Sequence, residues 1–271
     1  KIINLKSQFR EIKGTTKVEN QKDKEKNIRN KIKSYIIHLP QVDRSKQSAE
    51  RVYEEGRKFG YDTVLWNGVH KNDSLHLLHD LNMKIDGSWG GGILANWVGC
   101  FLSHYSLWKR SVIENERLMI LEHDVVFDDS IEIPEFDGVL NIGKPLWGNW
   151  WESEADGIHV RDISKCEKPH HHDVTWDDEY CLCNRDWLRG AHAYVVTPEV
   201  SEQLVRIANT KGIRPADTFI NSEVRVADYL PYPIWQEQRF SMIINPAHGE
   251  EWYDIRRENF NDYEDGDEVW N

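Results

Sequence analysis

The chain lacks several features that would place it in familiar classes of protein. Its 271 residues contain no uninterrupted apolar run long enough to cross a bilayer, so the sequence predicts no membrane span. Its four cysteines are too few for a disulfide scaffold, which favours a reduced, cytoplasmic setting. The first residues are rich in Lys and Asn without an apolar h-region, so no secretory signal is predicted among them.

The chain also lacks an excess of positive charge. Its formal net charge of −12 argues against a broad basic face for nucleic acid. Residues 1–33 nevertheless carry eleven Lys and Arg against four acidic residues, which leaves a charge of −19 for the remainder. We expect a basic, polar extension over residues 1–33, a folded domain over residues 34–248, and an acidic tail over residues 249–271.

Alternating strands and helices are predicted within the folded domain. Short apolar runs predict strands at residues 34–40, 63–66, 117–121, 139–143 and 193–196. Apolar residues at three- and four-residue steps predict helices at residues 45–59, 94–112 and 197–209. This alternation is the signature of an α/β sheet. The stretch of about forty residues after residue 143 shows little periodicity, and an irregular segment of that length is usually functional or mobile.

The sharpest feature of the sequence is Glu122-His123-Asp124, which follows an apolar run. A strand that ends in two carboxylates places them at the carboxyl edge of a sheet, where ligands of open α/β folds bind. Side chains two residues apart on an extended backbone point the same way, so both carboxylates can address one ion. Divalent cations such as Mg²⁺ prefer these oxygens and bridge them to substrate phosphates. The alternative is a solvated strand end without a ligand.

One glycine and two polar residues interrupt the apolar helix that precedes this strand: Gly99, Ser103 and His104. Glycine in a helix interior costs about 1 kcal/mol relative to alanine, which indicates close packing or a close backbone approach. A lone histidine in such a helix is usually a core residue with a hydrogen-bond partner. Its place beside the acidic strand makes His104 a candidate site residue.

These segments resemble glycosyltransferase family 25, which includes lipopolysaccharide sugar transferases and collagen galactosyltransferases. The resemblance spans residues 34–243 in order. Its motifs are residues 35–44 (Tyr-Ile-Ile-His-Leu-Pro-Gln-Val-Asp-Arg), Gly99-Cys100-x-x-Ser103-His104 with Trp108, Leu121-Glu122-His123-Asp124-Val125, Gly190-Ala191-His192-Ala193-Tyr194, Pro215-Ala216-Asp217 and, more loosely, Pro233-x-x-Gln236. This sequence has His123 where the family usually shows Asp, which puts the identity of the metal and strict metal dependence in question.

The resemblance implies a GT-A-like (Rossmann-like) α/β fold, a mixed sheet with flanking helices. It also implies an inverting transfer of a hexose from a UDP-type nucleotide-sugar donor to a hydroxyl of a glycan or protein acceptor, with Mn²⁺ or Mg²⁺. Glu122 and Asp124 take the place of the family's metal-binding acidic motif and contact the donor. Asp43, Arg44, Ser103 and His104 are further donor-binding candidates; for Asp43 and Arg44 the alternative is to cap the helix that follows.

The chemistry of sugar transfer calls for further groups. An inverting displacement needs a base for the acceptor's proton, and Asp217 matches the acidic position of GT-A enzymes that follows the glycine-rich strand. The alternative for Asp217 is to stabilise a helix N-terminus. His248 is a candidate third metal ligand, or else a loop histidine set between Pro246 and Gly249. Trp150, Trp151 and His192 are candidate acceptor contacts, although such tryptophans more often pack in a core or a lid.

Three alternatives remain open at this stage. The irregular segment carries thiols and imidazoles that suit a structural Zn²⁺, and a zinc-organised interaction module would follow. These residues are Cys166, His170, His171, His172, Cys181 and Cys183. A second alternative is a non-catalytic carbohydrate-binding protein with a degenerate fold, which His123 favours. The third is a transferase acting on hydroxylated DNA bases, for which the basic extension would have to overcome the acidic core.

Overall fold

A computed structural model of the chain describes residues 32–87, 95–128, 132–144, 157–160, 188, 190–230 and 232–236. The predicted acidic tail lies outside these residues, as does the predicted basic extension up to residue 31. Within the described part of the chain, no helix combines the length and the apolar character that crossing a membrane requires.

The centre of the fold is a seven-stranded mixed sheet with the strand order β2-β1-β3-β7-β5-β8-β6. Its strands are β1 (Lys33–His38), β2 (Asp62–Asn67), β3 (Leu118–Glu122), β5 (Val139–Asn141), β6 (Gly157–Val160), β7 (Ala193–Val196) and β8 (Val226–Leu230). Strands β2, β1 and β3 are parallel, and β5 is parallel to β8. Strand β7 joins these two groups because it is antiparallel to both β3 and β5. The prediction of a mixed α/β sheet is confirmed.

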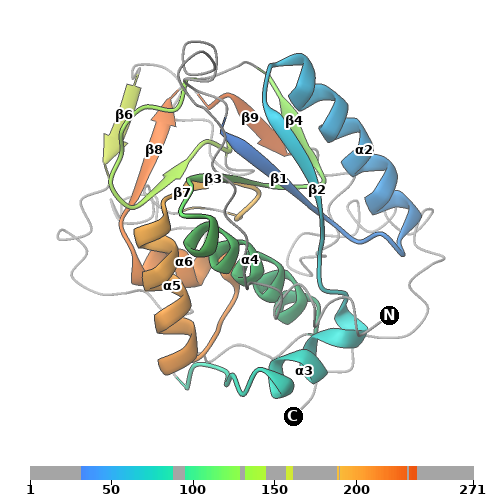
Figure 1. Cartoon of the computed structure of the whole chain (residues 1–271), viewed down its shortest axis with the longest axis vertical. Coiled ribbons are helices and arrows are strands. Elements are labelled where there is room, and N and C mark those ends of the chain that lie inside the picture. The colour runs from blue at the N-terminus through green and yellow to red at the C-terminus, as the bar shows by residue number, and fades with distance from the viewer. Residues whose placement is uncertain are drawn as a thin grey trace, which may run out of the picture.

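Helices cover both faces of this sheet (Figure 1). They are α2 (Asp43–Lys58), α3 (Lys71–Asp80), α4 (Ala95–Glu114), α5 (Pro198–Thr210) and α6 (Ala216–Glu223). Helix α2 lies on one face, and α4, α5 and α6 lie on the other with α3 beside them. Helix α5 begins as predicted, because the side chain of Thr197 accepts a hydrogen bond from the backbone N–H of Val200.

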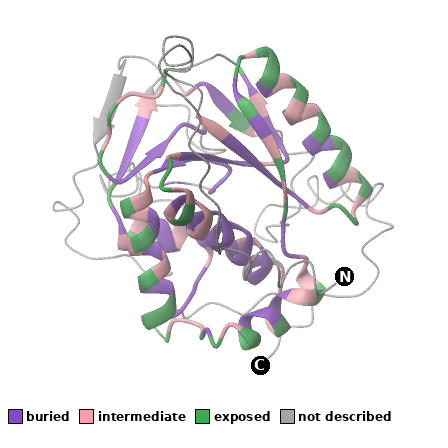
Figure 2. Ribbon diagram, in the orientation of Figure 1, coloured by how far each residue is buried: buried purple, intermediate pink, exposed green. Residues whose placement is uncertain are grey.

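The pleat of the central strands divides the interior into two cores. Tyr35 and Ile37 of β1 pack toward α3–α6, whereas Ile36 between them packs toward α2. Because successive side chains on a strand point to opposite faces, a strand covered on both faces is apolar at every position. Strand β3 shows the same division. Figure 2 shows α4 buried along most of its length, whereas α2 and α5 keep exposed outer faces.

Four described strands were not expected from the sequence: β6 and β8 of the central sheet, and two further strands outside it. Strands β4 (Val125–Phe127) and β9 (Ile234–Gln236) form a separate antiparallel pair, with Val125 opposite Gln236. Strand β6 pairs with β8, so the stretch predicted to be irregular contains a strand at residues 157–160. The β4–β9 pair brings the end of the described chain next to Asp124, the second carboxylate of the acidic motif.

Candidate functional site

The acidic motif lies at the carboxyl edge of the parallel strands, as predicted. In the register of the sheet, Ile37 of β1 is opposite Glu122 of β3, and His38 is opposite Asn67 of β2. Helix α2 begins a few residues after β1, with Asp43 as its first residue and Arg44 as its second. Asp43 is exposed in the first turn, where a negative charge is favoured by the helix dipole. A contact of either residue with a donor remains a prediction.

The two carboxylates of the motif are not held by one extended strand, which corrects the sequence-based geometry. Strand β3 ends at Glu122, and the chain turns at His123 and Asp124 before β4 begins. Glu122 therefore faces α4, while Asp124 Oδ2 accepts a hydrogen bond of 2.7 Å from Gln236 Nε2 of β9. The turn, rather than a shared strand face, sets the relation between the two acids.

Helix α2 fixes this turn from the other face of the sheet. Ser48 Oγ donates a hydrogen bond of 2.6 Å to the carbonyl of His123, and Arg51 Nη2 donates one of 2.9 Å to the carbonyl of Val125. Both acceptors are backbone oxygens, so neither of these two contacts uses the side chain of His123. The departure at His123 from the family pattern therefore leaves these two backbone contacts in place.

Two side chains of α4 contact the first carboxylate. Cys100 and His104 lie one helical turn apart, and Glu122 Oε1 lies 3.7 Å from Cys100 Sγ and 3.4 Å from His104 Nε2. Burial raises the pKa of the Cys100 thiol well above its usual range, and the nearby carboxylates raise it further. The thiol is therefore protonated and donates to Glu122.

A chain of hydrogen bonds behind His104 sets its tautomer. Trp108 Nε1 donates to Tyr194 Oη at 2.9 Å, and Tyr194 Oη lies 2.9 Å from His104 Nδ1. Because an indole N–H can only donate, the phenol oxygen accepts from Trp108 and directs its own hydrogen to His104 Nδ1. In the neutral imidazole the proton is then on Nε2, where it points at Glu122. Every polar hydrogen of this relay has an acceptor.

The glycine and serine of the α4 motif serve close packing. A Cβ on Gly99 would lie 2.6 Å from the carbonyl oxygen of Val69, so only glycine allows this approach. Ser103 is buried; its Oγ donates to the carbonyl of Gly99 at 2.7 Å and accepts from the backbone N–H of Val69 at 2.8 Å. The predicted close approach is confirmed at Gly99. A donor contact by Ser103 stays a prediction.

The pKa values of the two acids of the motif shift in opposite directions. Burial opposes ionisation of Glu122, but the hydrogen bond from His104 and the electrostatic influence of the neighbouring histidines outweigh it and lower the pKa. Burial, joined by the charge of Glu122, raises the pKa of Asp124 to about 8. Asp124 Oδ1 is also buried without a hydrogen-bond partner among the described residues. An ionised Asp124 therefore lacks a positive partner on that oxygen, which is the environment that a bound cation relieves.

The cluster on α4 offers a second set of possible metal ligands. The ligand atoms of Cys100, His104 and Glu122 all lie within 4.8 Å of one another, a spacing that one shared ion could bridge. Thiol and imidazole ligands suit Zn²⁺ more than Mg²⁺, and binding there would require Nε2 of His104 to lose its proton. The carboxylate of Glu122 is common to this set and to the predicted acidic motif.

Asp217 and His192 complete the polar cluster around Glu122. Asp217 lies in the first turn of α6, where its Oδ1 accepts a hydrogen bond of 2.8 Å from the backbone N–H of Thr218. Burial raises the pKa of Asp217, and the charge of Glu122 adds to this shift. The carbonyl of His192 accepts a hydrogen bond of 2.8 Å from the backbone N–H of Glu122.

The ring of His192 is held neutral. Its side chain is buried, and neither ring nitrogen has a hydrogen-bond partner among the residues that the structure describes. Burial lowers the pKa of His192 to about 4. The ring packs so closely over Gly143 that a Cβ there would lie 2.4 Å from His192 Nε2.

Sequence reasoning reached part of this cluster. The structure brings together five of the predicted residues: His104, Glu122, Asp124, Asp217 and His192. Other predicted residues lie outside the described part of the chain, namely Trp150, Trp151, His248 and the six Cys and His of the zinc hypothesis. Three contacting residues had been given no role: Cys100, Tyr194 and Gln236. The one available signal was the spacing of Cys100 and His104, because residues four apart share a helix face.

Sequence comparison with known proteins shows which family the chain belongs to. A family model described as glycosyltransferase family 25 (LPS biosynthesis protein) matches residues 32–220. A protein of Anopheles gambiae, "Glycosyltransferase 25 family member", is 26% identical over 190 residues, which are 68% of this chain and 26% of that protein. A protein of Drosophila pseudoobscura pseudoobscura with the same description is 31% identical over 110 residues, 40% of this chain and 14% of that protein. This chain thus spans about a quarter or less of the relatives' length in these matches. The chain belongs to glycosyltransferase family 25.

Proposed function

We propose that this protein is an inverting glycosyltransferase that moves a hexose from a UDP-type nucleotide-sugar donor to a hydroxyl of a glycan or protein acceptor. The observation that carries the proposal is the pair Glu122 and Asp124 at the carboxyl edge of β3, whose pKa values shift in opposite directions. Two neighbouring carboxylates whose negative charges repel each other bind a divalent cation well, because the cation takes the place of the proton that one of them would otherwise hold.

The donor set fits Mn²⁺ or Mg²⁺. Glu122 and Asp124 would hold the ion through carboxylate oxygens, with the unpartnered Oδ1 of Asp124 as one ligand, and His248 is the proposed third ligand. An ion bound there would stabilise the negative charge that builds on the leaving diphosphate. The relay from Trp108 to His104 holds Glu122 Oε1 on the α4 side, so Oε2 is left for the donor.

Asp217 is the proposed base. As the bond between the anomeric carbon and the diphosphate breaks, the acceptor oxygen forms a bond to that carbon from the opposite side and passes its proton to Asp217. A carboxylate with a raised pKa is a stronger base than an exposed Asp, which suits this transfer. We further propose that the neutral His192, together with Trp150 and Trp151, contacts the acceptor, and that the protein acts in the cytoplasm.

The test is calorimetric titration with UDP, GDP, CMP, UDP-glucose and UDP-galactose, each with and without Mn²⁺. It is run on the unaltered chain, on Asp124→Ala and on the control Asp128→Ala, an exposed acid just after β4. The proposal expects Mn²⁺-dependent binding of the uridine nucleotides that Asp124→Ala abolishes and Asp128→Ala retains. Absence of nucleotide binding in the unaltered chain would sink the proposal. Metal-independent glycan binding without turnover would instead support the carbohydrate-binding alternative.

A further inference from the structure

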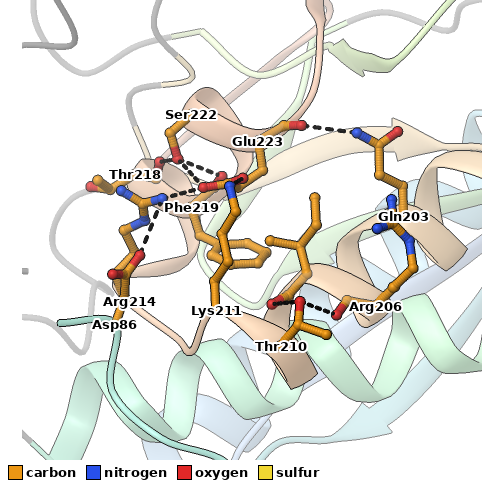
Figure 3. Close-up of polar contacts among 11 residues, drawn as sticks. Asp86, Gln203, Arg206, Thr210, Lys211, Arg214, Thr218, Phe219, Ser222 and Glu223 are labelled. Carbon is orange, nitrogen blue, oxygen red and sulfur yellow. Dashed lines mark hydrogen bonds and ion pairs between the residues drawn. The ribbon is translucent and has the colours of Figure 1, made fainter. Parts of the chain in front are cut away.

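A network of charged side chains, most of them buried or half-buried, links the two ends of the helix that carries Asp217 (Figure 3). Arg214, just before α6, is almost fully buried, and its guanidinium contacts Glu223, the last residue of α6, and Asp86 Oδ2 at 3.4 Å. The other oxygen of Glu223 accepts from Lys211 Nζ at 2.8 Å. The network thus spans α6 from its beginning to its end.

The network joins α6 to the chain that leads into α4. The backbone N–H of Asp86 donates to the carbonyl of Ile213 at 2.9 Å, and the N–H of Ile213 donates to the carbonyl of Lys84 at 2.8 Å. Gly212 makes this approach possible, with φ of +112° and a virtual Cβ only 2.7 to 2.8 Å from the backbone of residues 84–86. Residue 86 is followed, after a short segment, by the helix that bears Cys100 and His104.

Helix α6 also contacts the chain at Leu188, which leads to His192. Asn221 Oδ1 accepts from the backbone N–H of Leu188 at 2.8 Å, and its Nδ2 donates to the carbonyl of Leu188 at 3.2 Å. The chain continues from Leu188 to His192 and into β7. Arg214, just before α6, therefore contacts the chain that leads toward α4, and Asn221 of α6 contacts the chain that leads to His192, while α6 itself carries Asp217.

The buried charges of Arg214 and its partners are better explained by the orientation that they impose than by a gain in folding stability. Burying an ion pair removes both charges from water, and apolar side chains of the same volume often stabilise a fold as well or better. Arg214 also lowers folding stability in another way, because its Nε–H is buried without a hydrogen-bond partner among the described residues. What a guanidinium adds is a rigid, planar fork, one arm of which, Nη2, contacts the carboxylates of both Asp86 and Glu223.

We propose that Arg214 is a positioning residue, which sets Asp217 relative to Glu122 by locking α6 to the chain that enters α4. The proposal rests on the proposed transferase function, in which Asp217 is the base. Arg214 contacts neither reacting group in the described structure; it acts through the two carboxylates that it binds, Asp86 and Glu223.

The test compares Arg214→Lys and Asp86→Asn with Lys211→Met as the control. Lysine keeps the charge but not the fork, and Asp86→Asn removes only the partner on the α4 side. Lys211→Met removes a second ion pair to the same Glu223, one in which the lysine is exposed. For each folded variant, kcat is measured with Mn²⁺ and whichever of UDP-glucose and UDP-galactose the unaltered chain turns over, on one acceptor, beside the Kd of UDP and the melting temperature.

We expect kcat to fall at least about tenfold in Arg214→Lys and Asp86→Asn, because a small misplacement of a reacting group has effects of this size or larger. The nucleotide Kd is expected to stay within about twofold, and Lys211→Met to retain kcat. Unchanged kcat in folded Arg214→Lys and Asp86→Asn would overturn the positioning role, as would a parallel loss of nucleotide binding, which indicates general collapse of the site. A lack of turnover in the unaltered chain, with donor and acceptor panels exhausted, would overturn the transferase function and this proposal with it.

Discussion

Replacing Tyr194 by phenylalanine isolates the hydrogen-bond relay behind Glu122. The change removes one oxygen and keeps the ring, so the stacked contact with His104, at 5.7 Å between ring centroids, is preserved. The lost oxygen leaves Trp108 Nε1–H without an acceptor and His104 Nδ1 without a donor. All three side chains are fully buried, so water cannot take the place of the missing group.

The expected destabilisation follows from these two orphaned groups. Each buried polar atom left unpaired costs about 1–3 kcal/mol, so Tyr194→Phe is expected to lower the free energy of unfolding by about 2–6 kcal/mol. For a domain of this size, about 1 kcal/mol shifts the melting temperature by roughly 2–4 °C. The variant should therefore melt roughly 4–24 °C below the unaltered protein.

Tyr105→Phe is the matched control for this measurement. Tyr105 is a second buried tyrosine, but its single hydrogen bond, at 3.1 Å, goes to Asn209, which is exposed and can bind water instead. We expect a loss of only about 1 kcal/mol there. Urea denaturation of both variants supplies the comparison. If Tyr194→Phe costs no more than Tyr105→Phe, the relay and the tautomer inferred for His104 are wrong.

Two further predictions concern the ring of His192. In Gly143→Ala the added Cβ would lie 2.4 Å from His192 Nε2, so the ring must move. We expect the free energy of unfolding, measured by urea denaturation, to fall by about 1–3 kcal/mol and turnover to decrease. An unchanged free energy of unfolding would contradict this close packing. The pKa of His192 is about 4 when folded and about 6.5 when unfolded, so the unfolded state binds the proton first as pH falls. Stability from the neutral ring is thus present above pH 6.5 and lost toward pH 4, by roughly 3 kcal/mol. His192→Asn should lose about that much less stability than the unaltered chain between pH 7 and pH 4.5, and parallel pH profiles would refute the assignment.

Elements with a long local signal could be predicted from the sequence. The twenty residues of α4 repeat apolar side chains at helical steps, and α5 carries its own start signal in Thr197-Pro198. Strands β4 and β9 could not be predicted, because each has only three residues and its partner is more than a hundred residues away. The antiparallel direction of β7 could not be predicted either, because a strand buried on both faces has the same apolar pattern in both orientations.

The candidate site divides in the same way. The two acids and Asp217 were reached through motifs whose residue types and order are visible in the sequence. The position of Asp124 was derived from an extended strand, and the turn at His123 was missed because no Gly or Pro marks it. Tyr194 and Gln236 contact the site from strands that only the tertiary fold brings near, so no spacing in the sequence could assign them a role.

The insertion of β7 between β3 and β5 has a consequence for how the protein matures. During synthesis β3 emerges some seventy residues before β7, and until β7 arrives the N–H of Glu122 lacks the carbonyl of His192. Contacts between segments so distant in the chain form slowly, because their loop-closure entropy must be overcome first. The N-terminal half alone is therefore expected to expose β3 as an open, apolar edge. The proposed cation site at the acidic motif should accordingly form late, when the last third of the domain closes the sheet.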